Sequence, residues 1–400
     1  MRAAELGARV VLLEKNDKIG IKILISGGGK CNITHDCSVQ ELLHAFRPNE
    51  GKFLKSACYR FRNTDILALL EAKGLEVYTR PDGRVFPVDG TAKDVVRILG
   101  EHLDEAGVEV RLNAAVYELL AEGGRVQGAR LRSGEEVRAA ATIVCVGGAS
   151  YPKTGTTGDG YAWMRTLGHK VTPIRPALAP ITMEIDPKWP DERAGIALRD
   201  CLVKARQAKE VARWRGDLLF THTGVSGPTV LGISRVVAEC QLEGAVTLEV
   251  DLTPELAHEQ LTADILHFAK DHPKRAIGAF VAALMPERLV DKVFDQAEVD
   301  PSTVSGQLQA KARNRLIEVL KAWRLGTVKH VPMDRGEVVS GGVSLDEVDP
   351  GTMASRKAGG LYLAGEILDI AGPVGGYNLQ AAFSTGYVAG ENAAKQVLGR

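Results

Sequence analysis

The feature that most constrains the fold of this chain is the placement of its glycines behind apolar, strand-like segments. The segment ATIVCVGG (141–148) runs from a fully apolar stretch into two glycines, and GLYLAGE (360–366) ends in the same way. A continuous apolar run suits a parallel strand buried on both faces. A glycine behind such a strand lets the backbone approach a ligand closely. The pattern therefore predicts an α/β fold with a ligand at the strand ends.

Alternating helical and strand-like segments support a doubly wound, Rossmann-like sheet. A short helix over 2–6 precedes an apolar strand over 8–14. An amphipathic helix over 91–107 begins with a capping-box pattern, and strands are predicted over 108–112 and 126–131. This order of elements is typical of βαβ units.

The middle of the chain has a different texture. Residues 169–254 form Pro-punctuated strand patterns, which predict a β-rich, barrel-like insertion on the substrate side. Residues 255–327 have helical periodicity and predict a small helical unit. The glycine-rich texture returns over 328–400, so we expect this segment to complete the ligand-binding domain with residues 1–168.

Composition narrows the classes of partner. Fifty Lys and Arg balance fifty Asp and Glu, so the formal net charge of +0 disfavours nucleic acid and anionic membranes. The longest nearly apolar stretch, 139–149, is shorter than the roughly 20 residues that span a bilayer. Glu5 and Arg9 interrupt any signal-peptide pattern. We expect a cytoplasmic protein with a small-molecule substrate; the oligomeric state stays open.

The six cysteines indicate no metal chemistry. They form no CxxC pair and show no zinc-type spacing with histidine, and they are sparse for a disulfide framework. We expect reduced thiols and no metal site.

Two loops carry candidate phosphate-binding groups. In the first, three glycines stand among polar donors that can approach a phosphate; the candidates are Ser26, Gly27, Gly28, Gly29, Lys30, Cys31 and Asn32. The second starts at a strand end and finishes at a helix start, whose positive dipole end favours a phosphate or an electron-rich ring. Its candidates are Gly147, Gly148, Thr156, Gly158 and Asp159.

The C-terminal run 359–390 is the most specific segment. A strand ends at Gly365 and Glu366, and a loop with Asp369 leads to the pair Gly375 and Gly376 at a helix start. A helix N-terminus can stabilise the negative charge of a reduced flavin, and the two carboxylates are candidates for ribityl hydroxyls. The candidates for the flavin edge are Tyr377, Asn378 and Leu379.

Glu14 ends the first strand, where a dinucleotide-binding fold places the carboxylate that binds the adenosine ribose. Taken alone, this residue is better explained as a solvated strand end in the charge run EKNDK. The glycine runs favour the ribose assignment.

Together the motifs resemble the BaiN-like family of FAD-dependent oxidoreductases, which includes aminoacetone-oxidase-like and bile-acid-reductase-like flavoproteins. The matching segments follow the family's order: LLEKNDKIGIKILISGGGKCN, FPVDGTAKDVV, GGASYPKTGTTGDGY, LLFTHTGVSGP, SGGVSLDEVDPGTMASRK and GLYLAGEILDIAGPVGGYNLQAAFSTG. The resemblance implies bound FAD, with Glu14 at the adenosine ribose and the backbone of Val116 near the adenine. It places Lys22 among the cofactor contacts and residues 365–380 along the ribityl chain and isoalloxazine.

The sequence departs from the family pattern at three places. Ile21 and Lys30 stand where the family usually has arginine. The GxGxxG loop expected about 20 residues before Glu14 would precede Met1. We therefore hypothesise that Met1 is an internal methionine of a longer chain, and an upstream reading frame encoding a strand and GxGxxG would support this. Losing that loop would weaken FAD binding by about 10² to 10⁶-fold.

Catalytic candidates are few. His222 lies at a strand end before a glycine turn, where an imidazole can act as general acid or base, although a structural role is equally compatible. Tyr377 is a candidate proton donor, although packing against the flavin is the preferred interpretation of an aromatic residue at this position. Cys31 has no partner cysteine at redox spacing.

The resulting functional hypothesis is hydride transfer between flavin N5 and a small or medium organic substrate. A NAD(P)H-dependent C=C reductase is preferred on family grounds, and NAD(P)H would bind transiently because no second GxGxxG is present. The alternatives are an FAD-dependent amine oxidase and a flavin-poor, non-catalytic remnant. An RNA-modifying flavoenzyme is disfavoured by the neutral charge.

Overall fold

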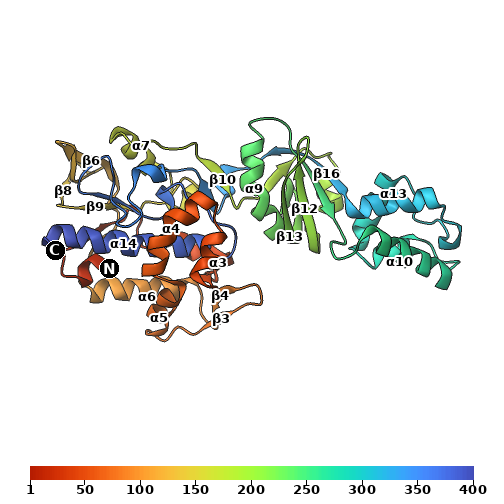
Figure 1. The fold of residues 1–400 in the computed structure, drawn as a ribbon, viewed down its shortest axis with the longest axis horizontal. Coiled ribbons are helices and arrows are strands. Elements are labelled where there is room, and N and C mark those ends of the chain that lie inside the picture. Colours follow the sequence, from red (N-terminus) through yellow and green to blue (C-terminus); the bar gives the residue numbers. More distant parts are fainter. The chain divides into compact units, whose positions relative to one another are not determined.

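The computed structural model describes residues 1–400, which divide into two compact units. Unit 1 combines Met1–Arg175 with Glu337–Arg400, and unit 2 is Pro176–Gly336. Figure 1 labels their elements along the chain. No helix is both long and apolar enough to cross a membrane.

Unit 1 contains parallel strand pairs of the expected Rossmann type. β1 (Val11–Leu13) pairs with β5 (Glu109–Arg111), and β9 (Thr142–Val144) pairs with β18 (Leu361–Leu363). The long helix α14 (Tyr377–Leu398) packs against both β9 and β18. These elements confirm the predicted fold class, although the parallel strands form two separate pairs.

Two antiparallel sheets complete unit 1. Their strands are β2 (Thr34–His35), β4 (Arg84–Pro87) and β3 (Val77–Thr79), and then β6 (Val116–Glu122), β7 (Arg125–Leu131) and β8 (Glu136–Arg138). Another short strand is β17 (Val338–Ser340). The helices are α1 (Arg2–Glu5), α2 (Ile21–Ile25), α3 (Val39–His44), α4 (Pro48–Arg60), α5 (Asn63–Glu71), α6 (Ala92–Glu105) and α7 (Asp159–Thr166).

Local signals explain where the unit 1 helices begin. Thr91 and Asp94 form the predicted capping box of α6. The Thr91 side chain accepts a backbone N–H of the first turn, and the Asp94 carboxylate accepts the Thr91 backbone N–H. A second capping box at Ser38 and Glu41 starts α3, which the periodicity analysis did not predict. α4 was missed as well, and its Pro48 occupies the favoured first helical position.

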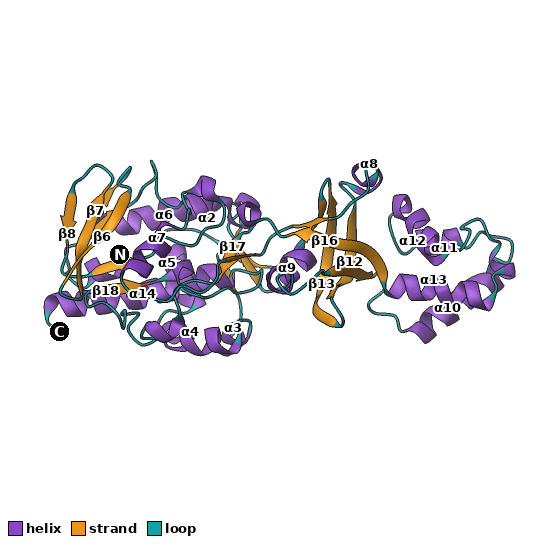
Figure 2. Cartoon of the chain, turned by 90° about the horizontal axis from the view of Figure 1, so that it is seen from above, coloured by secondary structure: helices purple, strands orange, loops and turns teal.

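Unit 2 is built on a closed six-stranded barrel in the order β11–β14–β13–β12–β15–β16 (Figure 2, orange). The strands are β11 (Ile181–Met183), β12 (Ala197–Arg206), β13 (Glu210–Thr221), β14 (Gly224–Ser226), β15 (Thr247–Asp251) and β16 (Trp323–His330). Inward-facing residues such as Val203, Phe220 and Leu248 are at most 1% exposed. The short strand β10 (Arg175–Ala177) lies at the junction of the two units.

Helices interrupt and cover this barrel. α9 (Pro228–Cys240) packs on β13, and α8 (Trp189–Arg193) follows β11. Between β15 and β16 the chain forms α10 (His258–Asp271), α11 (Gly278–Ala282), α12 (Val290–Ala297) and α13 (Ala310–Lys321).

The unit boundaries differ from the expected domain boundaries. They fall at 175/176 and 336/337, where the sequence texture placed them at 168/169 and 327/328. The β-rich insertion was expected to end at 254, yet the barrel closes only with β16. The reason is that β16 pairs with both β15 and β11, so a strand beyond the helices belongs to the barrel.

Candidate functional site

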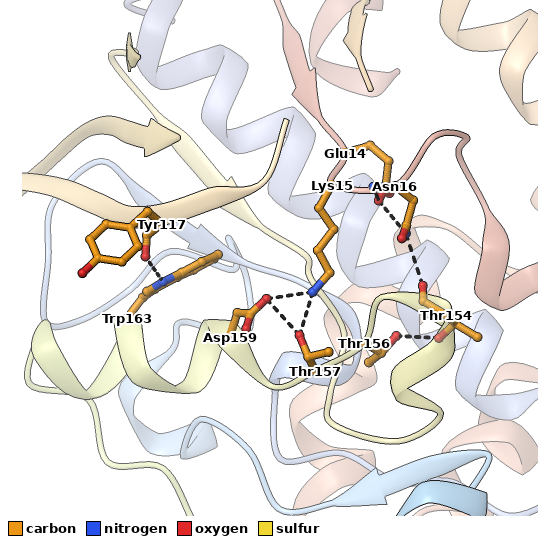
Figure 3. A network of polar contacts seen from close by, with 9 residues as sticks. All are labelled: Glu14, Lys15, Asn16, Tyr117, Thr154, Thr156, Thr157, Asp159 and Trp163. Carbon is orange, nitrogen blue, oxygen red and sulfur yellow. Dashed lines mark hydrogen bonds and ion pairs between the residues drawn. The ribbon is translucent and has the colours of Figure 1, made fainter. Parts of the chain in front are cut away.

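Glu14 lies at the end of β1 and has a defined local environment (Figure 3). Its Oε1 accepts hydrogen bonds from the Asn16 backbone N–H (2.9 Å) and side-chain amide (2.8 Å). Asn16 Nδ2 also donates to Thr154 O (3.2 Å) in the second glycine-rich loop. The structure thus holds the loop beside the strand end, and Glu14 Oε2 has no hydrogen-bond partner within the protein.

Lys15 ties the start of α7 to the same strand end. Its Nζ lies 2.7 Å from Asp159 Oδ2 and 2.6 Å from Thr157 Oγ1, and Figure 3 shows this triangle. Partial burial alone would raise the pKa of Asp159, but hydrogen bonds from Lys15 and Thr157 lower it overall. Asp159 is therefore ionised, and its ion pair with Lys15 holds the start of α7 against the end of β1. We call this ion pair the α7 clamp.

The backbone of Val116 lies near this group. Ala114 N–H donates to Glu14 O (2.8 Å), and β6 begins two residues later at Val116. Trp163 of α7 donates from Nε1 to Tyr117 O at 2.8 Å, so a hydrogen bond joins α7 and β6 (Figure 3).

The loop with the triple glycine adopts conformations that require glycine. Gly27 and Gly28 have φ of 56° and 67°, and a Cβ added at Gly27 would lie 2.7 Å from Asn32 N. Gly28 faces open space, so a ligand can approach its backbone. Lys30 is exposed beside them.

Two further residues of this loop have structural partners. Ser26 Oγ donates to Ile23 O (2.7 Å). Cys31 is fully buried, and burial raises the pKa of its thiol to about 11 although Ser26 opposes this. A protonated, buried thiol is a poor nucleophile, so the geometry supports packing for Cys31.

Lys22 and Glu366 join the three candidate loops. Lys22 Nζ lies 2.6 Å from Glu366 Oε2 and 3.1 Å from Ser150 Oγ. Glu366 also accepts hydrogen bonds from the backbone N–H groups of Val339 (2.8 Å) and Gly148 (3.4 Å). The carboxylate predicted for a ribityl hydroxyl is thus already engaged in the protein. The Glu366 carboxylate positions the segments around Lys22, Gly148 and Val339.

Small residues permit this close approach. A Cβ at Gly148 would lie 3.0 Å from Glu366 Oε1, and one at Gly147 would lie 3.1 Å from Thr156 Cγ2. Thr156 is buried and shares a hydrogen bond with Thr154 (3.1 Å). Gly158 has φ of 79° and forms the N-cap of α7.

Asp369 is engaged in the same way as Glu366. Its Oδ1 accepts from Gly341 N–H (3.0 Å) and its Oδ2 from Thr172 Oγ1 (2.9 Å). Both predicted carboxylates therefore organise backbone around the end of β18, where Gly365 has φ of 73°.

The N-terminus of α14 meets the triple-glycine loop. Asn32 Oδ1 accepts from Gly376 N–H (2.9 Å), and its amide donates to Thr34 O (3.1 Å). A Cβ at Gly376 would lie 2.5 Å from Thr34 C and O, so only glycine fits there. Gly375 also has a backbone conformation that favours glycine, with φ of 137°.

The first helical residues of α14 divide between polar and apolar roles. Asn378 Oδ1 accepts from Gly372 N–H (2.8 Å) and closes the preceding loop on the helix. Leu379 packs on a buried apolar cluster with Phe61 and Ile66.

The two catalytic candidates lie in different units. Tyr377 is the first residue of α14 in unit 1. His222 is exposed in the turn between β13 and β14 of unit 2. Its predicted role near a flavin stays a prediction.

Sequence reasoning missed several members of the site. Lys15 and Asn16 lie in the charge run directly after Glu14, a pattern that by itself is typical of solvated residues. His35, Ser150 and Thr172 carried no pattern, because their partners lie far away in the sequence. Only Asn16 offered a local signal, two residues after the strand-end carboxylate.

Taken together, the donor set of unit 1 fits a dinucleotide. Glu14 retains a free carboxylate oxygen at a strand end, and Gly28 leaves its backbone open to approach. The N-terminus of α14 supplies positive dipole character. Unit 1 thus offers a ribose acceptor, a phosphate cradle and a positive helix end.

Comparison with solved structures supports the fold. The 3-ketosteroid Δ1-dehydrogenase of Sterolibacterium denitrificans matches with a TM-score of 0.52 and 14% identity, over 98% of this chain and 96% of that one. The 3-ketosteroid Δ4-(5α)-dehydrogenase of Rhodococcus jostii matches with a TM-score of 0.51 and 17% identity, over 98% and 93%. At such identities the likeness shows the fold alone.

Comparison with curated sequences shows closer relatives. The 3-dehydro-bile acid delta(4,6)-reductase of Clostridium scindens is 31% identical over 97% of this chain and 93% of its own. The ribosomal RNA dihydrouridine synthase of Escherichia coli is 31% identical over 98% and 93%. The family model described as HI0933-like protein Rossmann domain matches residues 1–392. The chain therefore belongs to the HI0933-like Rossmann family, which confirms its resemblance to the BaiN-like flavoproteins.

Proposed function

We propose that this protein is an FAD-dependent reductase that saturates a C=C bond conjugated to a carbonyl group, with NAD(P)H as the electron donor. Two relatives of nearly equal identity support this choice. By name, one reduces the delta(4,6) positions of a 3-dehydro bile acid and the other makes dihydrouridine in RNA. In both, the bond that is saturated is conjugated to a carbonyl, so the shared chemistry is enone-type reduction.

The observation that carries the proposal is the linkage of the three glycine-rich loops in unit 1: Glu366 contacts both Lys22 and Gly148 N–H, and Asn32 accepts from Gly376 N–H at the start of α14. When bound, FAD supplies reversible hydride transfer. The chain's own residues would orient it: Glu14 at the ribose, the backbone around Gly28 and Gly158 at the phosphates, and the N–H groups at the start of α14 at the ring edge. Lys22 and Asp159 hold the loops in place.

The substrate separates two versions of the proposal. The balanced charge of the chain favours a small, neutral or anionic enone over RNA. The ribosomal RNA dihydrouridine synthase among the relatives favours a uridine in RNA. We take the small enone as the first candidate and the RNA uridine as the second.

The test begins with purified protein incubated with FAD and then separated from free cofactor. We expect a retained flavin spectrum, anaerobic bleaching by NADH or NADPH, and recovery of the oxidised spectrum on adding a 3-oxo-Δ4 steroid. Uridine-containing RNA tests the second candidate, and an aliphatic amine tests oxidase chemistry. If neither an enone nor uridine-containing RNA restored the oxidised flavin spectrum, the proposal would be contradicted. Glu14→Gln is the matched variant for specific FAD retention, because its amide oxygen can still accept from Asn16 while an NH2 group replaces the carboxylate oxygen predicted to bind the ribose.

A further inference from the structure

We propose that His35 positions and electrostatically supports Tyr377, and that the Tyr377 phenol delivers the proton that completes the reduction. This inference rests on the proposed function and adds a proton-donating pair to it. Both residues belong to unit 1: His35 ends β2 and Tyr377 begins α14.

The two rings form a held stack. The imidazole of His35 and the phenol ring of Tyr377 lie 4.6 Å apart between centroids, with planes inclined by 20°. Phe46 meets Tyr377 edge-on, at 6.3 Å and 89°. The tyrosine is therefore contacted on its face and at its edge, which limits the directions that its hydroxyl can take.

Three glycines make room for this stack. A Cβ at Gly83 would lie 2.3 Å from His35 Nε2, and one at Gly375 would lie 2.8 Å from Tyr377 Cε2. A Cβ at Gly372 would lie 2.7 Å from Phe46 Cε1. Because a side chain at any of these positions would collide with a ring, the surroundings are shaped around the pair.

The hydrogen bond of His35 determines its tautomer. Nδ1 lies 3.0 Å from the carbonyl oxygen of Gly375, which can only accept, so Nδ1 carries the hydrogen. Nε2 is then the nitrogen without a hydrogen in the neutral ring. The backbone around His35 is held by Asn63, whose amide donates to His35 O (2.8 Å) and to Cys37 O (2.9 Å).

Neighbouring groups keep Tyr377 in the protonated form. Burial first, and then Cys37 and Glu41, raise the pKa of Tyr377 to about 12. The phenol therefore keeps its proton at neutral pH and can act as a proton donor. The other charged groups near the pair are Arg84, which lies opposite His35 in the β2–β4 pairing, Asp36, beside Cys37, and Glu41, which interacts with His35. A protonated His35 is the cation that would offset the phenolate as it forms.

The proposed step balances as follows. Bound FAD, once reduced by NAD(P)H, would supply the hydride with its two electrons that the β-carbon of the enone receives. The α-carbon takes a proton from Tyr377 as its enolate collapses to the ketone, which leaves a saturated C–C bond. The phenolate then regains a proton from water, and His35 stabilises it in the interval.

The experiment uses the full chain loaded with FAD and four variants. His35→Phe retains a ring for stacking but cannot titrate, and His35→Asn retains a donor to Gly375 O but cannot stack. Tyr377→Phe removes the phenol. Tyr387→Phe is the matched control, since Tyr387 belongs to α14 like Tyr377 and stacks on Phe61, with ring centroids 4.9 Å apart and planes inclined by 25°.

Anaerobic stopped-flow then follows flavin reduction by NAD(P)H and reoxidation by the enone as functions of pH. We expect Tyr377→Phe to slow reoxidation by about 10² to 10⁴-fold. Both His35 variants should slow it by roughly 10-fold and remove one break from its pH profile. Flavin reduction should stay within about twofold in the two His35 variants and in Tyr387→Phe, because it needs no proton from His35. A profile in the His35 variants identical to that of the unmodified protein would overturn the inference.

A second readout does not depend on turnover. ¹⁵N NMR of the unmodified protein should show neutral His35 as the Nδ1–H tautomer, with an apparent pKa equal to the break that the variants lose. The opposite tautomer, or a pKa that differs from the break, would overturn the inference. Absence of reoxidation by every enone in the unmodified protein would instead contradict the proposed function.

Discussion

Unit 1 and unit 2 are stabilised in different ways. In unit 2 every barrel strand has two strand neighbours, and β12 and β13 are 10 and 12 residues long. In unit 1 the parallel strands are three residues long and form two separate pairs. Val11, Leu12 and Leu13 of β1 are only half-buried, whereas Val203 and Leu248 of the barrel are fully buried.

The backbone conformations differ as well. Most glycines with positive φ lie in unit 1, and unit 2 has six: Gly195, Gly216, Gly224, Gly227, Gly244 and Gly326. Unit 1 combines its glycine-rich loops with two apolar clusters, whereas unit 2 has one continuous apolar core. We infer that the order of the glycine-rich loops of unit 1 depends on loop hydrogen bonds and on its ligand, while unit 2 is stable through packing.

The largest expected effect is on the unit 2 core. Phe220 is 1% exposed and lies between Trp189 and Trp323, with centroids 5.7 Å and 6.0 Å away. Phe220→Ala should lower the free energy of unfolding of unit 2 by about 3–5 kcal/mol. Hydrogen exchange resolved by unit checks this, with Leu219→Ala (39% exposed) as the control. Equal losses in the two variants would show that the barrel core is not packed as described.

Adding FAD should act on the other unit. At a free concentration 100 times its Kd, a ligand that binds only the folded state adds about 2.7 kcal/mol. We expect slower hydrogen exchange in unit 1, above all in residues 26–32 and 147–159, and unchanged exchange in the barrel. Uniform protection of both units would remove the contrast between them.

Gly376 and Gly386 provide a matched pair in α14. A Cβ at Gly376 would meet Thr34 backbone at 2.5 Å with φ of 91°, whereas one at Gly386 meets nothing within 4 Å. Gly376→Ala should cost about 1–3 kcal/mol in unit 1 and weaken FAD retention. Gly386→Ala should gain about 0.4–1 kcal/mol. Thermal unfolding and flavin absorbance measure both effects, and similar values for the two variants would contradict the role given to Gly376.

The smallest expected effect is the pH dependence of the α7 clamp. Because the folded state has a lowered pKa at Asp159, the stability from its pairing with Lys15 is present above the unfolded pKa of about 4 and is lost as pH falls through the folded pKa. Both side chains are about one-third exposed, so we expect a modest change. Exchange of residues 157–166 between pH 6 and pH 3 measures it, and Lys15→Met should flatten the dependence. If the pH dependence of exchange were the same in Lys15→Met, it would arise from other carboxylates.

Much of the fold could be read from local pattern. The apolar strand over 141–144, the capping box at Thr91 and the helix that begins after Gly376 each depend on neighbouring residues, and each is present in the structure. The closure of the barrel by β16 was not predicted, because it depends on pairing across the helices that separate β15 from β16.

The candidate site divides along the same line. The sequence by itself determined which backbone segments carry glycines at strand ends, because conformational freedom is a property of single residues. Only the tertiary structure decided what the side chains do: Glu366 pairs with Lys22, Asp369 holds Gly341, and His35 stacks on Tyr377. These contacts join residues tens to hundreds of positions apart, and no local spacing records a hydrogen bond or a ring contact that forms only when the chain has folded.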